Sequence, residues 1–303
     1  MNGTVIVVNP AAGGGRAART WERLAGAAAA LAEHRVVSPE SAQATREAVA
    51  AAVAGGCDRV VCFGGDGTVH LVAGVLLAAG AGERVTIGVV PVGTGSDLAR
   101  TLAVVREPRA ALERALLGPP VAMDAASCTG EAGDFTFVNT AAAGIAGLVD
   151  ELVNAQPQRG STVFLRATLA ALRRYRCVPV RLRADGEEWV EGPALLVAVA
   201  NGTTFGKGMR IAPGARLDDG LLDVVFVGEV RPAELPMRLT QLYLGKHMGA
   251  EPVRHRRVRR LDFEPLGQLP VFDADGEPYP SGKATFEVLP GALRVAGPLA
   301  PSR

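Results

Sequence analysis

Up to Leu117, short runs of β-branched residues alternate with alanine-rich stretches, and this alternation constrains the fold more than any other feature. The apolar runs are almost uninterrupted, which is typical of parallel strands with helices on both faces of the sheet. We therefore predict a doubly wound, mostly parallel α/β domain. The predicted strands are Thr4–Val8, Arg35–Val37, Arg59–Phe63 and Val85–Val90, and the predicted helices are Arg16–Glu33, Ala42–Ala54, Val69–Ala79 and Pro108–Leu117.

The sequence Gly118-Pro119-Pro120 ends this pattern and marks a predicted domain boundary. Beyond it, strand-like runs joined by Gly, Pro or Asp turns predominate, which predicts a mainly antiparallel, β-sandwich-like domain with one or two helices. The expected domains are residues 1–120 and 121–294, and the tail from about 295 to 303 is free to return to the first. Within the second domain we predict a helix at Thr162–Tyr175 and strands at Phe135–Asn139, Val178–Arg183, Ala194–Ala200, Leu222–Val227, Arg259–Glu264 and Ala284–Leu289.

Composition and charge exclude several classes of protein. A hydrophobic content of 48% supports a substantial core, and 32 Lys+Arg against 31 Asp+Glu gives no general attraction to nucleic acid. The four cysteines form no C-x-x-C pair and do not cluster with the four histidines, so we expect reduced thiols rather than a zinc site. The N-terminus lacks a signal-peptide pattern, and the longest stretch without Asp, Glu, Lys or Arg, residues 67–82, is too short to span a bilayer. We predict a cytoplasmic protein.

Three glycine-bearing loops follow predicted strands, at Asn9–Arg16, Gly64–Thr68 and Gly93–Asp97. Such loops gather at the carboxyl edge of a doubly wound sheet, where ligands bind. Glycines let backbone N–H groups approach a phosphate closely, and the helix that follows adds a positive dipole. Asp66 suits a phosphate site only if Mg²⁺ bridges its carboxylate to the phosphates.

Taken singly, these loops leave alternatives open. Each is compatible with an ordinary structural turn. The first also fits a dinucleotide-binding pattern through Gly13, Gly15 and Ala18, with Glu40 after the second strand. A Walker loop is absent, because no Gly-Lys-Ser or Gly-Lys-Thr occurs in the chain.

Five motifs together resemble the diacylglycerol kinase catalytic family, which includes bacterial lipid kinases and sphingosine and ceramide kinases. They follow the family's order and span nearly the whole chain. GGDGT alone also occurs in NAD kinases and phosphofructokinases, so the specificity lies in the set. The motifs are NPAAGGGR at Asn9–Arg16, FGGDGTVH at Phe63–His70, PVGTGSDLAR at Pro91–Arg100, VANGTTFGKGMRIAPGARLDDGLLDV at Val199–Val224 and DADGE at Asp273–Glu277.

The resemblance implies an ATP site in the first domain and assigns Asp66 and Asp97 to the catalytic metal and phosphate network. Ala12 stands where the family often has Ser, and Gly14 where it usually has Lys; Arg16 is the candidate replacement for that positive charge. The residues that the resemblance places at ATP are Asn9, Pro10, Ala11, Ala12, Gly13, Ser38, Gly64, Gly65, Asp66, Gly67, Thr68, Val69, His70 and Thr94.

The resemblance also implies that the second domain binds lipid and metal. It assigns Mg²⁺ to the carboxylate of Asp219 and the carbonyls of Arg216 and Leu221, which are the hard oxygen ligands that Mg²⁺ prefers. It makes Glu277 the general base, and a carboxylate suits that role because the acceptor alcohol loses a proton as the phosphoryl group arrives. From the residues alone, hairpin turns are the favoured interpretation of both Asp-Gly segments.

Three further segments are candidates for contact with lipid. The basic runs Arg254–Arg260 and Arg173–Arg176 would be attracted to an anionic membrane by ~1 kcal/mol per basic residue, although a solvated surface explains them equally well. The apolar stretch Ala141–Val149, after Phe137 and Asn139, is a candidate lining for an acyl chain, with ordinary core packing as the alternative.

The function that these observations predict is an ATP- and Mg²⁺-dependent lipid kinase that converts diacylglycerol to phosphatidic acid. The expected partners are a diacylglycerol-like lipid and, peripherally, an anionic surface at the inner face of the membrane, but no nucleic acid; a homodimer is left open. An NAD kinase and a catalytically silent lipid- or nucleotide-binding protein are the alternatives. Intact carboxylates at Asp66, Asp97, Asp219 and Glu277 argue against the silent protein.

Overall fold

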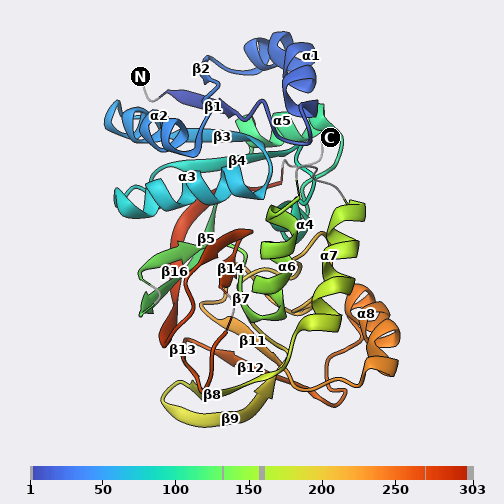
Figure 1. The fold of residues 1–303 in the computed structure, drawn as a ribbon. Helices are drawn as coiled ribbons and strands as arrows, with labels where there is room; N and C mark the ends of the chain where they lie inside the picture. Colours follow the sequence, from blue (N-terminus) through green and yellow to red (C-terminus); the bar gives the residue numbers. More distant parts are fainter. Residues whose placement is uncertain (1–2, 132, 157–160, 270, 299–303) are drawn as a thin grey trace. The chain divides into compact units, whose positions relative to one another are not determined.

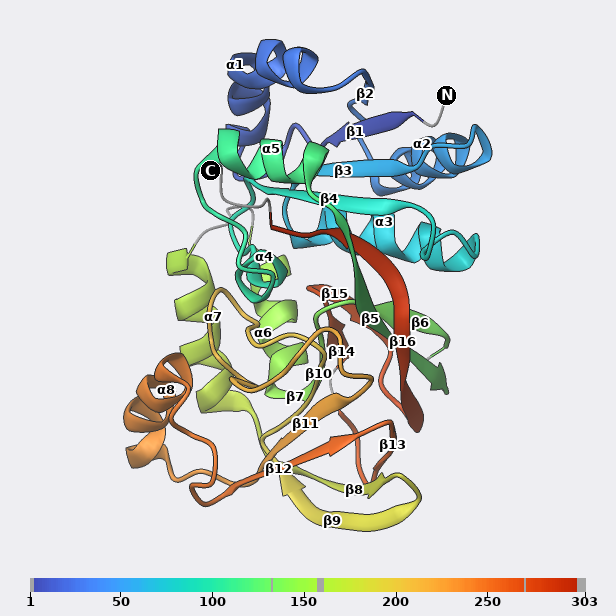
Figure 2. The same ribbon diagram turned by 180° about the vertical axis from the view of Figure 1, so that it is seen from behind.

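The computed structural model describes residues 3–131, 133–156, 161–269 and 271–298 (Figures 1 and 2). The chain divides into two compact units, Met1–Asp124 with Gly291–Arg303 (unit 1) and Ala125–Pro290 (unit 2). Strands β5 (Pro120–Gly130) and β16 (Ala284–Ala296) run from one unit into the other. No helix in the described part of the chain is long and apolar enough to cross a membrane.

Unit 1 contains a parallel sheet in the strand order β2-β1-β3-β4. The end of β16 extends this sheet in parallel, with Arg294 opposite Thr86 and Val295 opposite Ile87. This arrangement confirms the predicted doubly wound, mostly parallel α/β fold. The strands are β1 (Thr4–Val8), β2 (His34–Val37), β3 (Arg59–Gly64) and β4 (Thr86–Pro91).

Two pairs of helices cover the opposite faces of this sheet, α1 with α5 and α2 with α3 (Figures 1 and 2). Local caps fix where two of them begin: the Ser41 hydroxyl accepts the Ala44 N–H at 3.1 Å, and the Glu107 carboxylate receives two N–H groups ahead of α5. The helix predicted from Val69 begins three residues earlier, so Asp66 lies in its first turn. The helices are α1 (Arg16–Leu31), α2 (Ala42–Ala54), α3 (Asp66–Ala78), α4 (Asp97–Thr101) and α5 (Pro108–Leu117).

Unit 2 is built from antiparallel strands, which confirms the predicted β-sandwich-like domain. One sheet has the order β12-β11-β10-β7-β14-β15, and the strands that face it across the core include β5, β6, β8, β9, β13 and β16. Edge-to-face contacts among Phe263, Phe272 and Phe286 lie in that core. The remaining strand bounds are β6 (Phe135–Phe137), β7 (Thr140–Gly144), β8 (Val178–Ala184), β9 (Glu187–Ala194), β10 (Leu196–Ala200), β11 (Leu222–Val227), β12 (Val253–Val258), β13 (Arg260–Pro265), β14 (Phe272–Ala274) and β15 (Glu277–Tyr279).

Three α-helices, rather than the predicted one or two, cover the outer face of the six-stranded sheet in the described part of unit 2: α6 (Ile145–Asn154), α7 (Ser161–Arg174) and α8 (Leu235–Leu244) (Figure 1). The stretch Ala141–Val149 is divided between β7 and α6. Gly144 makes the break with φ 96°, where a Cβ would lie 2.6 Å from the Leu195 carbonyl oxygen. Gly144 is the only turn residue in the sequence at this change from strand to helix, so the sequence gives little indication of it.

Candidate functional site

The loop after β1 is held at both ends by polar contacts. The Asn9 amide donates to the Thr68 hydroxyl at 3.2 Å, and its carbonyl oxygen accepts the Ala11 N–H at 3.2 Å. Three left-handed glycines follow, and α1 then begins without a side-chain cap. At Gly13 a Cβ would lie 2.5 Å from the Val92 carbonyl oxygen, so this close approach to the loop after β4 requires glycine.

Arg16 also joins these two loops. Its guanidinium donates to the carbonyl oxygens of Val92 at 3.2 Å and Gly93 at 3.1 Å. The Arg16 guanidinium, the predicted replacement for the family's lysine, therefore contacts the loop after β4.

The Asp66 carboxylate connects the loop after β3 to the loop after β4. It accepts the N–H groups of Asp97 at 2.9 Å and Leu98 at 3.3 Å, and so caps the start of α4. Asp97 is 5% exposed and pairs with Arg100 at 2.5 Å. A Cβ on Gly95 would lie 3.0 Å from one Asp66 oxygen and 4.0 Å from one Asp97 oxygen, so the structure brings the two predicted catalytic carboxylates together around this glycine.

The other residues assigned to ATP fall into two groups. Thr68, Val69 and His70 are buried in α3, so their side chains pack beneath the loop that joins β3 to α3. Ser38 is exposed at the carboxyl end of β2, beside β1. Because all strands of this sheet are parallel, Ser38 and the loops that contain Asn9–Gly13, Gly64–Gly67 and Thr94 share its carboxyl edge.

A basic cavity of about 480 Å³ opens beside the loop after β4. Thr94 is among its lining residues. Four arginines contribute to its wall, and guanidinium groups bind phosphate oxygens in bidentate fashion. Arg23 and Arg106 were not predicted from the sequence. Arg23 follows Arg16 by seven residues along α1, about two helical turns, so both lie on one face of the helix. The four are Arg16, Arg23, Arg100 and Arg106.

In unit 2, Glu277 begins β15 directly after a two-residue hairpin turn. Asp275 (φ 54°) and Gly276 (φ 88°) are both left-handed, as a type I′ turn requires. The Asp275 carboxylate accepts three consecutive backbone N–H groups, those of Val138 at 2.8 Å, Asn139 at 2.9 Å and Thr140 at 3.0 Å. The sequence analysis treated Asp275 only as a turn residue, but it anchors the hairpin that presents Glu277, whose side chain is exposed.

A second Asp-Gly-Glu hairpin provides an internal comparison. Asp185 (φ 52°) and Gly186 (φ 86°) connect β8 to β9, and Glu187 begins β9. The Asp185 carboxylate accepts the N–H groups of Arg259 and Arg260, both at 2.9 Å, but these bonds are exposed. The two hairpins therefore share backbone geometry and differ in their surroundings.

The residues assigned to Mg²⁺ in unit 2 are already engaged in contacts. One Asp219 oxygen accepts the Leu221 N–H at 3.1 Å, and the other pairs with Arg257 of β12. The Arg216 side chain pairs with Asp218 at 3.1 Å. The described residues include no cluster of three His, Cys, Asp or Glu side chains suited to a metal. Asp219 offers a hard oxygen of the kind that Mg²⁺ prefers, and in this structure that oxygen is paired with Arg257.

Three of the five arginines in the basic run Arg254–Arg260 form ion pairs within unit 2. Arg256 pairs with Glu187 at 2.7 Å, and Arg257 with Asp219. Arg260 pairs with Asp262 at 3.0 Å and Glu287 at 3.2 Å. These pairs and the position of the run in β12 and β13 favour a structural role for most of its charge.

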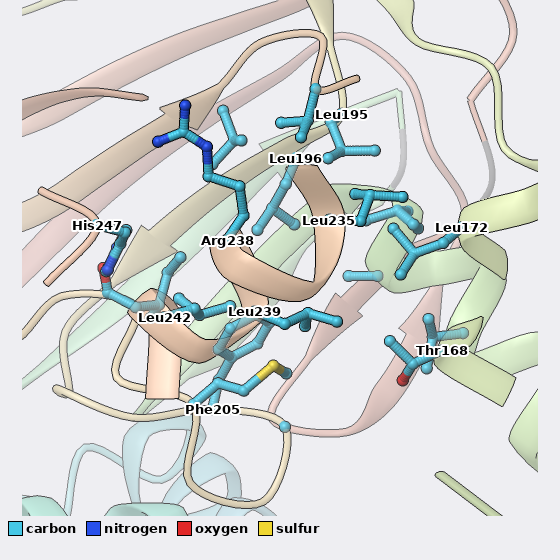
Figure 3. Close-up of a pocket in the computed structure, with 18 of the residues that line it drawn as sticks. Thr168, Leu172, Leu195, Leu196, Phe205, Leu235, Arg238, Leu239, Leu242 and His247 are labelled. Carbon is cyan, nitrogen blue, oxygen red and sulfur yellow. The ribbon is translucent and has the colours of Figure 1, made fainter. Parts of the chain in front are cut away.

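An apolar cavity of about 130 Å³ lies between α6, α7, α8 and the sheet (Figure 3). Ile145, Ala146 and Val149, from the predicted acyl-chain stretch, line it, whereas Phe137 and Asn139 do not. The side chains that Figure 3 labels are Thr168, Leu172, Leu195, Leu196, Phe205, Leu235, Arg238, Leu239, Leu242 and His247.

The polar groups on this cavity are few, and at least two of them are held by protein contacts. Arg238 pairs with Glu234 at 3.2 Å. The His247 Nε2 lies 3.0 Å from the Ile211 carbonyl oxygen, and burial lowers the pKa of His247, which favours its neutral form. The cavity therefore suits an alkyl chain better than a charged ligand.

Comparison with known proteins identifies the family. Residues 3–128 match the family described as "Diacylglycerol kinase catalytic domain", and residues 139–297 match "YegS C-terminal NAD kinase beta sandwich-like domain". A "Diacylglycerol kinase" from Mycobacterium tuberculosis is 32% identical over 303 residues, covering 96% of this chain and 94% of its own. A "Probable lipid kinase YegS-like" from Chromohalobacter salexigens is 33% identical over 257 residues, covering 84% of this chain and 79% of its own.

Solved structures show the same fold. The crystal structure of a diacylglycerol kinase from Bacillus anthracis superposes with a TM-score of 0.73 at 21% identity, over 99% of this chain and 97% of that one. An NAD kinase from Archaeoglobus fulgidus superposes with a TM-score of 0.52 at 15% identity, over 97% and 94%. The likeness to the NAD kinase is one of fold alone.

The two domain types define a kinase of the class that phosphorylates lipids. The chain belongs to the diacylglycerol kinase catalytic-domain family, with the C-terminal domain of its YegS-like lipid kinases, as the sequence motifs predicted.

Replacing Asp275 tests whether its carboxylate anchors the hairpin of Glu277. We expect Asp275→Asn to lower the free energy of unfolding by about 2–3 kcal/mol, because charge-assisted bonds to three N–H groups are lost and an amide N–H₂ faces a donor. Asp185→Asn, with exposed bonds in the matching hairpin, should cost less than about 1 kcal/mol. Urea denaturation measures both, and equal losses would contradict the anchoring role.

Proposed function

We propose that the protein transfers the γ-phosphoryl group of ATP to the hydroxyl of diacylglycerol, giving phosphatidic acid and ADP. The apolar cavity of unit 2 is the observation that carries the choice of acceptor. An acyl chain gains free energy by burial among aliphatic side chains, whereas a second nucleotide needs polar partners for its ribose and base. An NAD kinase is therefore the less favoured reading.

The proposed ATP site is the carboxyl edge of the unit 1 sheet. Its loops, Asn9–Gly13, Gly64–His70 and the loop with Thr94, supply backbone N–H groups, and Ser38 supplies a hydroxyl. The basic cavity supports the proposal, because its arginines offset the charge of a polyphosphate. Val69 and His70 would support the site from within α3, since their side chains are buried and the Val69 N–H donates to the Gly65 carbonyl oxygen at 3.3 Å.

In the proposed chemistry, Asp66 and Glu277 have separate roles. Asp66 holds α4 against the loop after β3, so the phosphates meet a rigid site that includes Asp97. Mg²⁺, when bound, neutralises charge on the transferring group. The acceptor oxygen forms a bond to the γ-phosphorus as the bond to the bridging β–γ oxygen breaks, and the hydroxyl proton passes to the Glu277 carboxylate.

A kinase assay with an acceptor panel tests the proposal. Diacylglycerol, monoacylglycerol, ceramide, sphingosine and NAD are each offered with γ-labelled ATP and Mg²⁺. Label in phosphatidic acid supports the proposal, and label in NADP or another lipid product overturns the choice of acceptor. Binding of ATP without transfer to any acceptor would favour the silent binding protein.

The two Asp-Gly-Glu hairpins allow a matched test of the base. We expect Glu277→Gln to lower kcat by roughly 100-fold or more, because the amide cannot accept the hydroxyl proton. Glu187→Gln, at the same position of the second hairpin, should leave kcat within about twofold of the unchanged protein, since exposed ion pairs contribute little. Equal kcat values for the two variants would rule out Glu277 as the base.

Competition between Arg257 and Mg²⁺ tests the proposed metal ligand Asp219. Arg257→Gln frees an Asp219 oxygen and should tighten Mg²⁺ binding roughly tenfold, whereas Asp219→Asn should weaken it. The Mg²⁺ dependence of the melting temperature measures both without requiring turnover. Arg256→Gln, next to Arg257 but paired with Glu187, is the control; if it matches Arg257→Gln, Asp219 is not a ligand.

A further inference from the structure

Helix α8 is apolar around most of its circumference, yet none of its residues is fully buried. In soluble proteins a helix of this composition is normally covered. Nine large hydrophobic side chains are exposed in the described part of the chain, and three of them lie on this one helix. They are Met237 at 51%, Tyr243 at 46% and Leu244 at 56% exposed.

The apolar side chains of α8 form two opposite faces. Leu235, Leu239 and Leu242 follow the i, i+4, i+7 spacing of one face and line the apolar cavity (Figure 3). Met237 and Leu244 lie seven residues apart, about two turns, on the other face, which points to solvent. A single helix thus separates an apolar cavity from an apolar surface.

Several exposed basic residues lie near α8 in the chain or on the neighbouring helix. Arg231 precedes α8, Lys246 follows it, and the Arg210 N–H donates to the Leu242 carbonyl oxygen at 3.1 Å. On α7, which lies beside α8 in both ribbon views, Arg166, Arg173 and Arg174 are exposed.

None of these six side chains forms an ion pair with another described residue, whereas Arg256, Arg257 and Arg260 each do. In the loops that flank α8, the exposed acidic side chains Glu229 and Glu251 match Arg231 and Lys246 in number. The excess of positive charge comes from Arg210 and from the arginines of α7, whose sequence contains no Asp or Glu.

We propose that α8 is the surface by which unit 2 docks on an anionic phospholipid bilayer. Met237, Tyr243 and Leu244 enter the boundary between head groups and acyl chains, as the apolar face of an interfacial helix does, with tyrosine at head-group depth. The unpaired basic side chains bind the lipid phosphates. Because the opposite face of α8 lines the apolar cavity, a lipid leaving the bilayer at this helix meets that cavity directly.

Charge complementarity favours a bilayer over a second copy of the chain, whose own α8 surface would carry the same positive charge. Docking on a bilayer serves the proposed lipid kinase activity, so its functional meaning rests on that proposal. Binding to vesicles, however, requires neither ATP nor a substrate.

Vesicle flotation tests the proposal with the full chain and no nucleotide. The probe is vesicles of phosphatidylcholine with about 30% phosphatidylglycerol. Vesicles of pure phosphatidylcholine test whether binding requires anionic lipid. The double substitution Met237→Ser with Leu244→Ser should reduce binding at least tenfold. Leu117→Ser with Leu266→Ser, which removes two other exposed leucines (47% and 42% exposed), should bind as the unchanged protein does.

Three outcomes would overturn the proposal: no binding by the unchanged protein, equal binding by both double variants, or dimerisation lost with Met237→Ser and Leu244→Ser while vesicle binding persists. Circular dichroism melting of both variants separates loss of docking from loss of folding. Kinase activity on a short-chain, water-soluble diacylglycerol provides a separate readout. It should survive the α8 substitutions, and its absence in the unchanged protein would count against the proposed function and leave the vesicle result standing.

Discussion

The Asp66 carboxylate is the contact on which the geometry of unit 1 depends. It lies in the first turn of α3 and receives the N–H groups that open α4, so the ends of β3 and β4 cannot move independently. Gly13 lets the first loop approach the Val92 carbonyl oxygen within a distance that a Cβ would block, and a Cβ on Gly95 would lie in close contact, 3.0 Å, with an Asp66 oxygen. These contacts create a rigid edge, and a rigid edge is what phosphoryl transfer needs, because its catalysis is mostly positioning and electrostatics.

In unit 2, as in unit 1, an aspartate carboxylate accepts backbone N–H groups and fixes a loop. The Asp275 carboxylate takes three N–H groups from the segment that leads into β7, and the hairpin that follows carries Glu277. The matching hairpin at Asp185 has exposed bonds and carries a glutamate committed to Arg256. The same turn sequence therefore occurs in two different surroundings, and the proposed role of Glu277 rests on the packing around its turn.

The sequence predicted those features that depend on local pattern. Parallel strands showed as apolar runs, and GGDGT with DADGE indicated the family. Helices α6 and α8 were not predicted, because α6 follows a buried strand at Gly144 without a polar break and α8 is apolar on both faces. The pairing of Arg257 with Asp219 and the contacts of Asp275 join residues far apart in the chain, and no short-range pattern encodes such pairs.

The proposed function requires that the cavity of unit 2 receives the acyl chain of the acceptor lipid. Photolabelling with a diacylglycerol that carries a diazirine on one acyl chain tests this requirement, with the labelled peptides identified by mass spectrometry. We expect adducts on cavity-lining residues such as Phe205, Met209, Leu239 and Leu242, reduced by excess unlabelled diacylglycerol. Specific adducts confined to residues outside the cavity would contradict it.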